Sequence, residues 1–415
     1  MAANLKEWFK NSKERLKTNS CVNLLWLINF LPTLAGFPMM SRKINVSFWI
    51  IHTILLFYVY IFGTVVYQMY FAEGFVDSVN SFFNISVFIL IFNTSSWLLF
   101  KRNDLNSLLK LIKISDDLIK ESKRFSKMYQ KLLRKIKIII LMCYIFHFVN
   151  DVMIFIPSRT FGMDGFSVVS CVGKYRFNIY LCRFKTLSTN INFVIFSGIE
   201  PLSKSPNRQI CMGILAAQEL TAIVAVGSYD VILLFLFSYT TVIFQILYED
   251  MNSLSELAKN HDDGIQKASV IEARLKNLTV RHKLALKTVK DLQNIYSITI
   301  GIGFGLDAIS MCLFFVLPLD VCLNFAPLIY HSLFVFFLYC FQGQRLTTAS
   351  EMFEKAVYDC GWENMRVKEQ RNVLLILKLA QKPVIVVAAG VIPIRIHTFA
   401  NTMQSIYKFV TVFKV

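Results

Sequence analysis

Seven long apolar runs alternate with charged segments along this chain of 415 residues. Each run holds about 20 residues or more, which is enough for a helix to cross a hydrocarbon layer of ~30 Å. The runs are residues 46–70, 77–100, 136–156, 209–247, 293–318, 322–342 and, less apolar than the others, 391–413. This pattern predicts an all-α membrane protein with seven transmembrane helices.

Helical periodicity continues beyond several of these runs. In residues 101–137, Leu and Ile alternate with charged residues at the spacing expected of two projecting helices. From Ile271 to Tyr296, mostly apolar positions recur at the 4-3 spacing of a helix-bundle seam. We therefore expect the fourth, fifth and sixth helices to extend beyond the membrane and to pack together as an anchor bundle.

Lysine and arginine are concentrated in four of the segments outside the runs. Of the 44 basic residues, 34 lie in segments 1–45, 101–137, 249–290 and 343–382. Lys and Arg near membrane ends stay in the cytoplasm, so we expect a cytoplasmic N-terminus and an extracellular C-terminus. This is the reverse of a G-protein-coupled receptor. The net charge of +17 comes from basic segments beside the apolar runs, so we expect anionic membrane lipid rather than nucleic acid as their partner.

These observations predict a layout of six regions. Residues 21–40 are apolar but broken by Pro32, Gly36 and Pro38, which predicts a re-entrant segment. The regions are the cytoplasmic N-terminus with that segment (1–45), transmembrane helices 1–4 with a long outer loop at 157–208 (46–248), a cytoplasmic helical region (249–292), helices 5 and 6 (293–342), a cytoplasmic anchor (343–390) and the seventh helix (391–415).

The nine cysteines form neither a CxxC motif nor a Cys/His zinc pattern, so we expect no metal and no cofactor. Two pairs, Cys171 with Cys182 and Cys211 with Cys322, lie on the predicted outer face, and either a disulfide or free thiols fit them. The sequence carries no HExxH, P-loop or GxSxG motif, so we expect no enzyme.

The seventh helix is predicted to have two opposed faces. Polar positions recur at 4-3 spacing on one face and apolar positions on another, and they are His397, Asn401, Gln404, Lys408 and Thr411 against Phe399, Met403, Ile406, Val410 and Phe413. Polar groups without partners in hydrocarbon cost several kcal/mol, so the polar face needs water or a partner. Two arrangements satisfy it: several subunits enclosing an ion conduit, or burial against helices of the same chain.

Two C-terminal stretches resemble the insect odorant receptor family. They are FFLYCFQGQRLTTASEMFEKAVYDCGW at 336–362 and the segment 374–413, and Tyr229, Asp230 and LPTLAGFPMM near the start fit the looser family pattern. The sister gustatory receptors carry Thr-Tyr and Gln-Phe in the last helix. Ile406 and Tyr407 stand here without Gln-Phe, which favours the odorant branch.

The resemblance implies a tuning subunit that binds a volatile odorant and assembles as a tetramer with the Orco co-receptor. Such an assembly is an odorant-gated, non-selective channel for monovalent and divalent cations in the plasma membrane. Matching the tail tyrosine of the family to Tyr407 places the constriction near Val410 and Lys414, whereas the polar face points to Gln404, Lys408 and Thr411. The sequence leaves open which face lines the pore.

The resemblance also implies a ligand pocket in the outer half of the bundle, between the second and sixth helices. Aromatic and methionine side chains bind small volatiles by desolvation, with a few polar groups for orientation. The candidate residues are Phe82, Phe83, Phe88, Phe146, Asn150, Met153, Gln218, Thr221, Met311, Phe314 and Tyr330.

Three other classes compete with this interpretation. A gustatory channel shares the mechanism but differs in ligand and needs no Orco. A seven-helix metabotropic receptor conflicts with the charge distribution and with the absence of Asp-Arg-Tyr and Asn-Pro-x-x-Tyr motifs. A transporter needs related halves, and the sequence shows no convincing repeat.

Overall fold

A computed structural model describes residues 12–40, 45–66, 75–121, 123–155, 207–259, 265–316 and 319–413. Nearly all of this part of the chain is helical. The predicted loop 157–208 lies almost wholly outside the described residues, as do the side chains of all four cysteines in the two candidate pairs.

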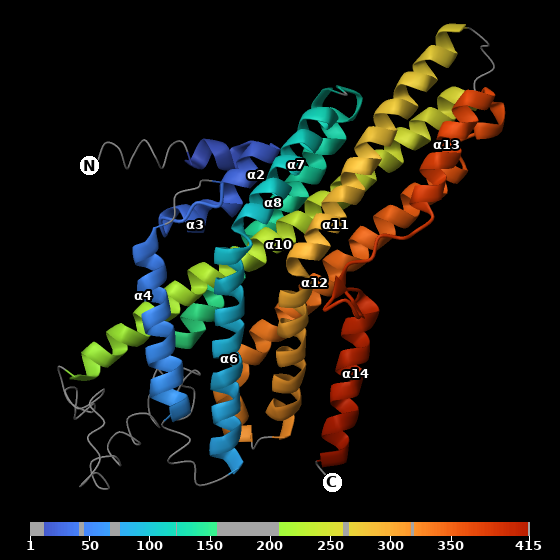
Figure 1. Cartoon of the computed structure of the whole chain (residues 1–415). Coiled ribbons are helices and arrows are strands. Elements are labelled where there is room, and N and C mark those ends of the chain that lie inside the picture. Colours follow the sequence, from blue (N-terminus) through green and yellow to red (C-terminus); the bar gives the residue numbers. More distant parts are fainter. Residues whose placement is uncertain are drawn as a thin grey trace, which may run out of the picture.

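Three very long helices run through the molecule, namely α10 (Asn207–Lys259), α11 (Ile265–Val316) and α12 (Leu319–Tyr358) (Figure 1). The 53 residues of α10 span about 80 Å, more than twice the thickness of a bilayer core. The three helices contact one another, and the predicted packing of their extensions is confirmed. Seam residues Ile271, Leu275, Leu278 and His282 are all buried.

The extensions form what we call the basic end of the molecule. It includes α7 (Arg102–Glu121), the short helix η2 (Lys123–Phe125), the first turns of α8 (Ser126–Phe155), the short helix η4 (Trp362–Asn364) and α13 (Val367–Ala380). Here the buried Arg281 on α11 pairs with Asp250 on α10. Burial raises the pKa of the Tyr129 phenol, which stays protonated and donates to Asp116 at 2.7 Å.

The N-terminal part wraps the same bundle. It consists of α2 (Cys21–Ile28), α3 (Phe30–Leu34), α4 (Val46–Leu56), the π-helix η1 (Phe57–Val66) and α6 (Phe75–Phe100). Ser20 caps α2 by accepting from the backbone N–H of Asn23 at 3.2 Å. The break in the apolar segment falls at Asn29, between α2 and α3, whereas Pro32 lies inside α3.

A β-hairpin leads into the last helix. Strands β1 (Val387–Ala388) and β2 (Ile392–Pro393) pair antiparallel and precede α14 (Ile396–Phe413). The transmembrane helix expected from residue 391 therefore begins at Ile396. Residues 389–391 connect the two strands, and Ala389 and Gly390 in this turn have φ of 50° and 74°, in the left-handed region that favours glycine.

Four of the described helices are long and apolar enough to cross a membrane. They lie within residues Phe82–Phe100, Ala216–Ala258, Ala268–Phe315 and Ala326–Asn364, and Val46–Ile61 is a shorter apolar helix. Helix α14 runs beside α11 and α12, along the halves of these helices that lie away from the basic end (Figure 1). It contacts both of them.

Candidate functional site

A network of buried and partly buried polar side chains joins α4, α6 and α10 away from the basic end. His52, only 1% exposed, lies with Nδ1 3.0 Å from the Thr221 hydroxyl and Nε2 2.8 Å from the Ser95 hydroxyl. The Thr221 hydroxyl donates to the carbonyl of Gln218 at 2.9 Å. The single O–H of Thr221 is used in this bond, so towards His52 the Thr221 oxygen accepts from Nδ1–H. His52 Nε2 therefore has no proton and accepts from the Ser95 hydroxyl.

Gln218 contributes its backbone carbonyl to this network, and its side chain is wholly buried. Among the described residues, neither its amide nitrogen nor its amide oxygen has a hydrogen-bond partner. A buried primary amide without partners is unusual, since leaving one unpaired costs about 1–3 kcal/mol. This amide therefore offers both a donor and an acceptor to a molecule that enters the site.

Apolar residues lie one helical turn from these polar residues, since Ala222 follows Gln218 on α10 and Leu56 follows His52 on α4. Leu56, Tyr60, Ile91 and Ala222 form a small buried cluster, against which Val59, Val87, Phe88 and Val226 pack. Tyr60 belongs to the π-helix η1, a rare conformation that is frequently found at functional sites. An apolar wall with a few polar groups has the composition of a small-molecule site.

The predicted ligand residues fall into two groups. Phe88, Gln218 and Thr221 adjoin the site just described, and Phe88 also packs its ring 5.4 Å from that of Phe57. In the second group, Phe146 on α8 lies with its ring centroid 5.5 Å from that of Tyr330 on α12.

The other predicted ligand residues differ widely in exposure. Phe83 and Met311 are fully buried in the main core, and Asn150 is buried as well. Phe82 and Phe314 are partly buried, whereas Met153 is 39% and Tyr330 61% exposed. The high exposure of Tyr330 makes it a poor candidate for an enclosed pocket within one chain.

The two faces of α14 are separated as predicted from the sequence. The apolar side chains Phe399, Met403, Ile406 and Val410 pack against the core of the chain. The polar side chains His397, Asn401, Gln404, Lys408 and Thr411 are exposed, together with Tyr407 at 70%. Of the predicted pore-lining residues, Val410 thus faces its own chain, and Lys414 lies outside the described residues.

The hairpin before α14 is fastened to α11. Gln293 donates through Nε2 to the Val387 carbonyl at 2.5 Å and accepts from the Val387 N–H at 2.7 Å. The Ser297 hydroxyl donates to the same carbonyl at 2.9 Å, and the Ala389 N–H donates to the Ser297 carbonyl at 2.7 Å. A Cβ on Gly301 would lie 2.6 Å from that of Ala389, so glycine permits this close approach.

The sequence interpretation missed several of these residues. His52, Ser95, Gln293 and Ser297 lie in apolar or unremarkable contexts, and their partners are far away along the chain. Single polar residues within apolar runs were the one available signal.

Known proteins of similar sequence and fold support the same classification. The family model described as 7tm Odorant receptor matches residues 73–407. The chain belongs to this family. Odorant receptor 49a of Drosophila melanogaster is 23% identical over 145 residues, which cover 34% of this chain and 37% of that protein. Odorant receptor 2a of the same organism is 33% identical over 75 residues, or 18% of this chain and 19% of the relative.

The matches span 37% of the length of odorant receptor 49a and 19% of the length of odorant receptor 2a. Solved structures match over nearly the whole chain. The insect olfactory receptor OR5 from Machilis hrabei in complex with eugenol has a TM-score of 0.66 at 12% identity, covering 94% of this chain and 97% of that one. The OR5 structure without eugenol has a TM-score of 0.67 at 14% identity, covering 99% of this chain and 98% of that one. The chain therefore has the all-α, multi-pass membrane fold of these receptors, as predicted.

Proposed function

We propose that this chain is the odorant-binding subunit of a ligand-gated, non-selective cation channel that it forms with Orco in the plasma membrane. The observation that carries the ligand-binding part is the buried Gln218 amide, which is unpaired among the described residues and lies one helical turn from Ala222 of the apolar cluster. Membership of the odorant receptor family supports the class of ligand.

The ligand in this proposal is a small volatile with one oxygen-bearing group. Its apolar body is desolvated against Leu56, Ile91 and Phe88, and its polar group pairs with the Gln218 amide. The hydroxyl of Thr221 fixes one side of the site through His52. Phe146 contributes from the second group, where it stacks on α12.

The conduit in this proposal is formed by the polar face of α14. An exposed row of Gln404, Lys408 and Thr411 is costly in lipid, whereas copies from several subunits together enclose water. Of the two arrangements that satisfy the polar face, its exposure supports assembly of subunits over burial within one chain. Tyr407 flanks the row, and Val410 supports the helix from behind.

Gating in this proposal passes from the ligand to α14 through α11 and the hairpin. A ligand shifts the open population only if it binds the open arrangement more tightly. Moving the ratio from 1:99 to 99:1 needs about 5.5 kcal/mol in all, shared among the subunits that bind ligand. The contacts of Gln293 and Ser297 with the hairpin provide a direct mechanical connection.

The orientation in this proposal follows the charge distribution. The basic end faces the cytoplasm, and the C-terminus faces outward. Asn277, which begins an Asn-Leu-Thr sequon, is exposed at the basic end and should stay free of sugar. Glycan on Asn277 in expressed receptor would contradict this orientation and favour a metabotropic receptor.

Current recording from cells that express this chain with and without Orco tests the function. We expect currents evoked by at least one volatile in a panel of alcohols, esters, aldehydes and terpenes, and only when Orco is present. Gln218→Leu should lower the potency of oxygenated agonists at least tenfold, while Gln344→Leu on the basic half of α12 should leave their potency unchanged. Responses without Orco would point to a gustatory-type channel, and equal tuning of the Gln218→Leu variant would exclude the site.

A further inference from the structure

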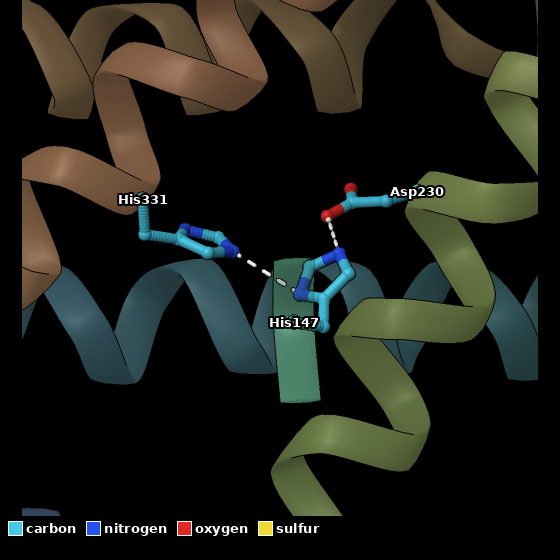
Figure 2. Close-up of side chains that lie close together, drawn as sticks. All are labelled: His147, Asp230 and His331. Carbon is cyan, nitrogen blue, oxygen red and sulfur yellow. Dashed lines mark hydrogen bonds and ion pairs between the residues drawn. The ribbon is translucent and has the colours of Figure 1, made fainter. Parts of the chain in front are cut away.

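Two imidazoles and a carboxylate lie close together in the part of the bundle away from the basic end (Figure 2). His147 comes from α8, Asp230 from α10 and His331 from α12. Nε2 of His147 lies 3.0 Å from Oδ2 of Asp230, and its Nδ1 lies 3.3 Å from Nε2 of His331. One potential ligand atom from each of the three residues lies within 4.8 Å of those from the other two. His147 and Asp230 are buried, and His331 is partly buried.

The two contacts of the Asp230 carboxylate determine which nitrogen of His147 is free. The Tyr339 hydroxyl donates to Oδ1 of Asp230, and the neighbouring Oδ2 faces His147 Nε2. A carboxylate accepts only, so Nε2 of His147 carries the proton in this pair. The lone pair of neutral His147 is then on Nδ1, which is directed at His331 (Figure 2). The His331 ring can present either an N–H or a second lone pair at that point.

The separation of these two nitrogens suits a metal ion. Two nitrogen ligands at 2.0–2.1 Å from a tetrahedral zinc ion lie roughly 3.3–3.4 Å apart. The observed separation of 3.3 Å matches the spacing of two nitrogen ligands on one ion. Asp230 then holds His147 from behind, as carboxylates commonly hold metal-bound histidines.

A fourth group completes the charge balance. Cys143 lies one turn before His147 on the same face of α8, is buried and carries a free thiol. A divalent ion with one carboxylate nearby leaves one positive charge in an apolar interior, which is unfavourable. Deprotonation of Cys143 on binding removes that charge and adds a soft ligand, which favours zinc or copper over magnesium or calcium.

We propose that His147 and His331 form a binding site for a divalent transition-metal ion, with Cys143 as a third ligand and Asp230 holding His147 in place. The site ties α8 and α12 together beside α10.

Titration of the purified full-length receptor with Co²⁺ tests the proposal without odorant or Orco, so its outcome is independent of the proposed function. We expect one Co²⁺ per chain, visible absorption of tetrahedral intensity with a near-ultraviolet thiolate band, and displacement by Zn²⁺. His331→Gln and His147→Gln should abolish binding, Asp230→Asn should weaken it 10- to 100-fold, and Cys143→Ser should remove the thiolate band. His397→Gln, on the exposed face of α14, is the matched control.

Absence of Co²⁺ and Zn²⁺ binding at micromolar concentrations would overturn the proposal, and so would unchanged binding by the His147→Gln and His331→Gln variants. The cluster would then be a hydrogen-bonded chain that holds three helices together. X-ray absorption of the zinc-loaded unmodified receptor needs no variant and guards against misfolding. Two imidazole nitrogens and one sulfur around zinc support the site, whereas an all-oxygen shell contradicts it.

Discussion

Gly343 on α12 lies against the carbonyl oxygen of Ile394, the first residue after the hairpin and two residues before α14. A Cβ at position 343 would overlap that oxygen and lie 3.0 Å from both the carbonyl carbon and Cγ2 of Ile394. Ile394 is itself buried and donates its N–H to the Val386 carbonyl at 2.9 Å. The backbone at the start of α14 is therefore held at a distance from α12 that only glycine permits.

Gly343→Ala should displace the hairpin and lower the free energy of unfolding by about 1–3 kcal/mol, because overpacking forces the backbone apart. We expect smaller evoked currents from the same amount of surface receptor and a lower midpoint of thermal unfolding. Gly305→Ala on α11 is the control, since its Cβ would meet no other atom within 4 Å. Equal behaviour of the two variants would show that the close approach does not matter.

Gln293→Leu should loosen the same hairpin from α11. The substitution removes two hydrogen bonds and leaves the Val387 N–H unpaired, which costs about 1–3 kcal/mol. If the hairpin transmits gating, the concentration for half-maximal activation should also change. Gln381→Leu at the exposed end of α13 is the control, and both variants are compared by thermal unfolding and dose–response curves. A stability loss without any change in dose response would separate folding from gating.

The buried pair of Arg281 and Asp250 clips α10 to α11 at the basic end. Their side chains are 5% and 10% exposed, so removing one partner leaves a buried charge unpaired. Arg281→Leu and Asp250→Leu should each destabilise by about 3–5 kcal/mol, and the double variant should recover most of this loss. Thermal unfolding in a double-mutant cycle measures the coupling. Simple addition of the two losses would show that the pair is not coupled.

The sequence predicted those features of the fold that depend on repeated patterns. The seam from Ile271 to Tyr296 and the two faces of α14 follow a helical period over many residues, and each position supports the others. Local detail was less accessible. The last helix begins at Ile396 rather than at residue 391, because the hairpin takes up the intervening residues.

The candidate site was less predictable for a different reason. Hydrogen bonds such as His52 to Thr221 join residues 169 positions apart, and no periodicity in either helix indicates such a pairing. The π-helix η1 consists mostly of apolar and aromatic residues, so its sequence does not distinguish it from an ordinary helix. Composition therefore indicated suitable wall residues such as Phe88, but not which of them adjoin a polar group.

Thr221→Val should disturb ligand recognition more than folding. The change removes the hydroxyl that fixes His52 and the Gln218 carbonyl, at a cost of about 0.5–1.5 kcal/mol. We expect altered relative potencies among oxygenated volatiles, measured as dose–response curves with Orco. Thr279→Val on the basic half of α11 removes a comparable helix-backbone hydrogen bond from Thr279 to the Leu275 carbonyl and should leave the potencies unchanged. Identical tuning of both variants would contradict a role for Thr221.

Lys408 gives the sharpest test of which face of α14 lines the conduit. It is exposed in the polar row, one turn after Gln404 and about one turn before Thr411. A positive charge in a water-filled pore repels cations, and the repulsion is strongest for divalent ions. Lys408→Glu should therefore raise the permeability to Ca²⁺ relative to Na⁺, with Lys408→Gln intermediate, as measured by reversal potentials of ligand-evoked currents. Lys283→Glu makes the same charge change on the exposed surface of α11 and should have no such effect. If permeability ratios were the same in all three variants as in the unmodified channel, the Gln404–Lys408–Thr411 face would lie outside the conduit, and the face that carries Val410 would become the candidate.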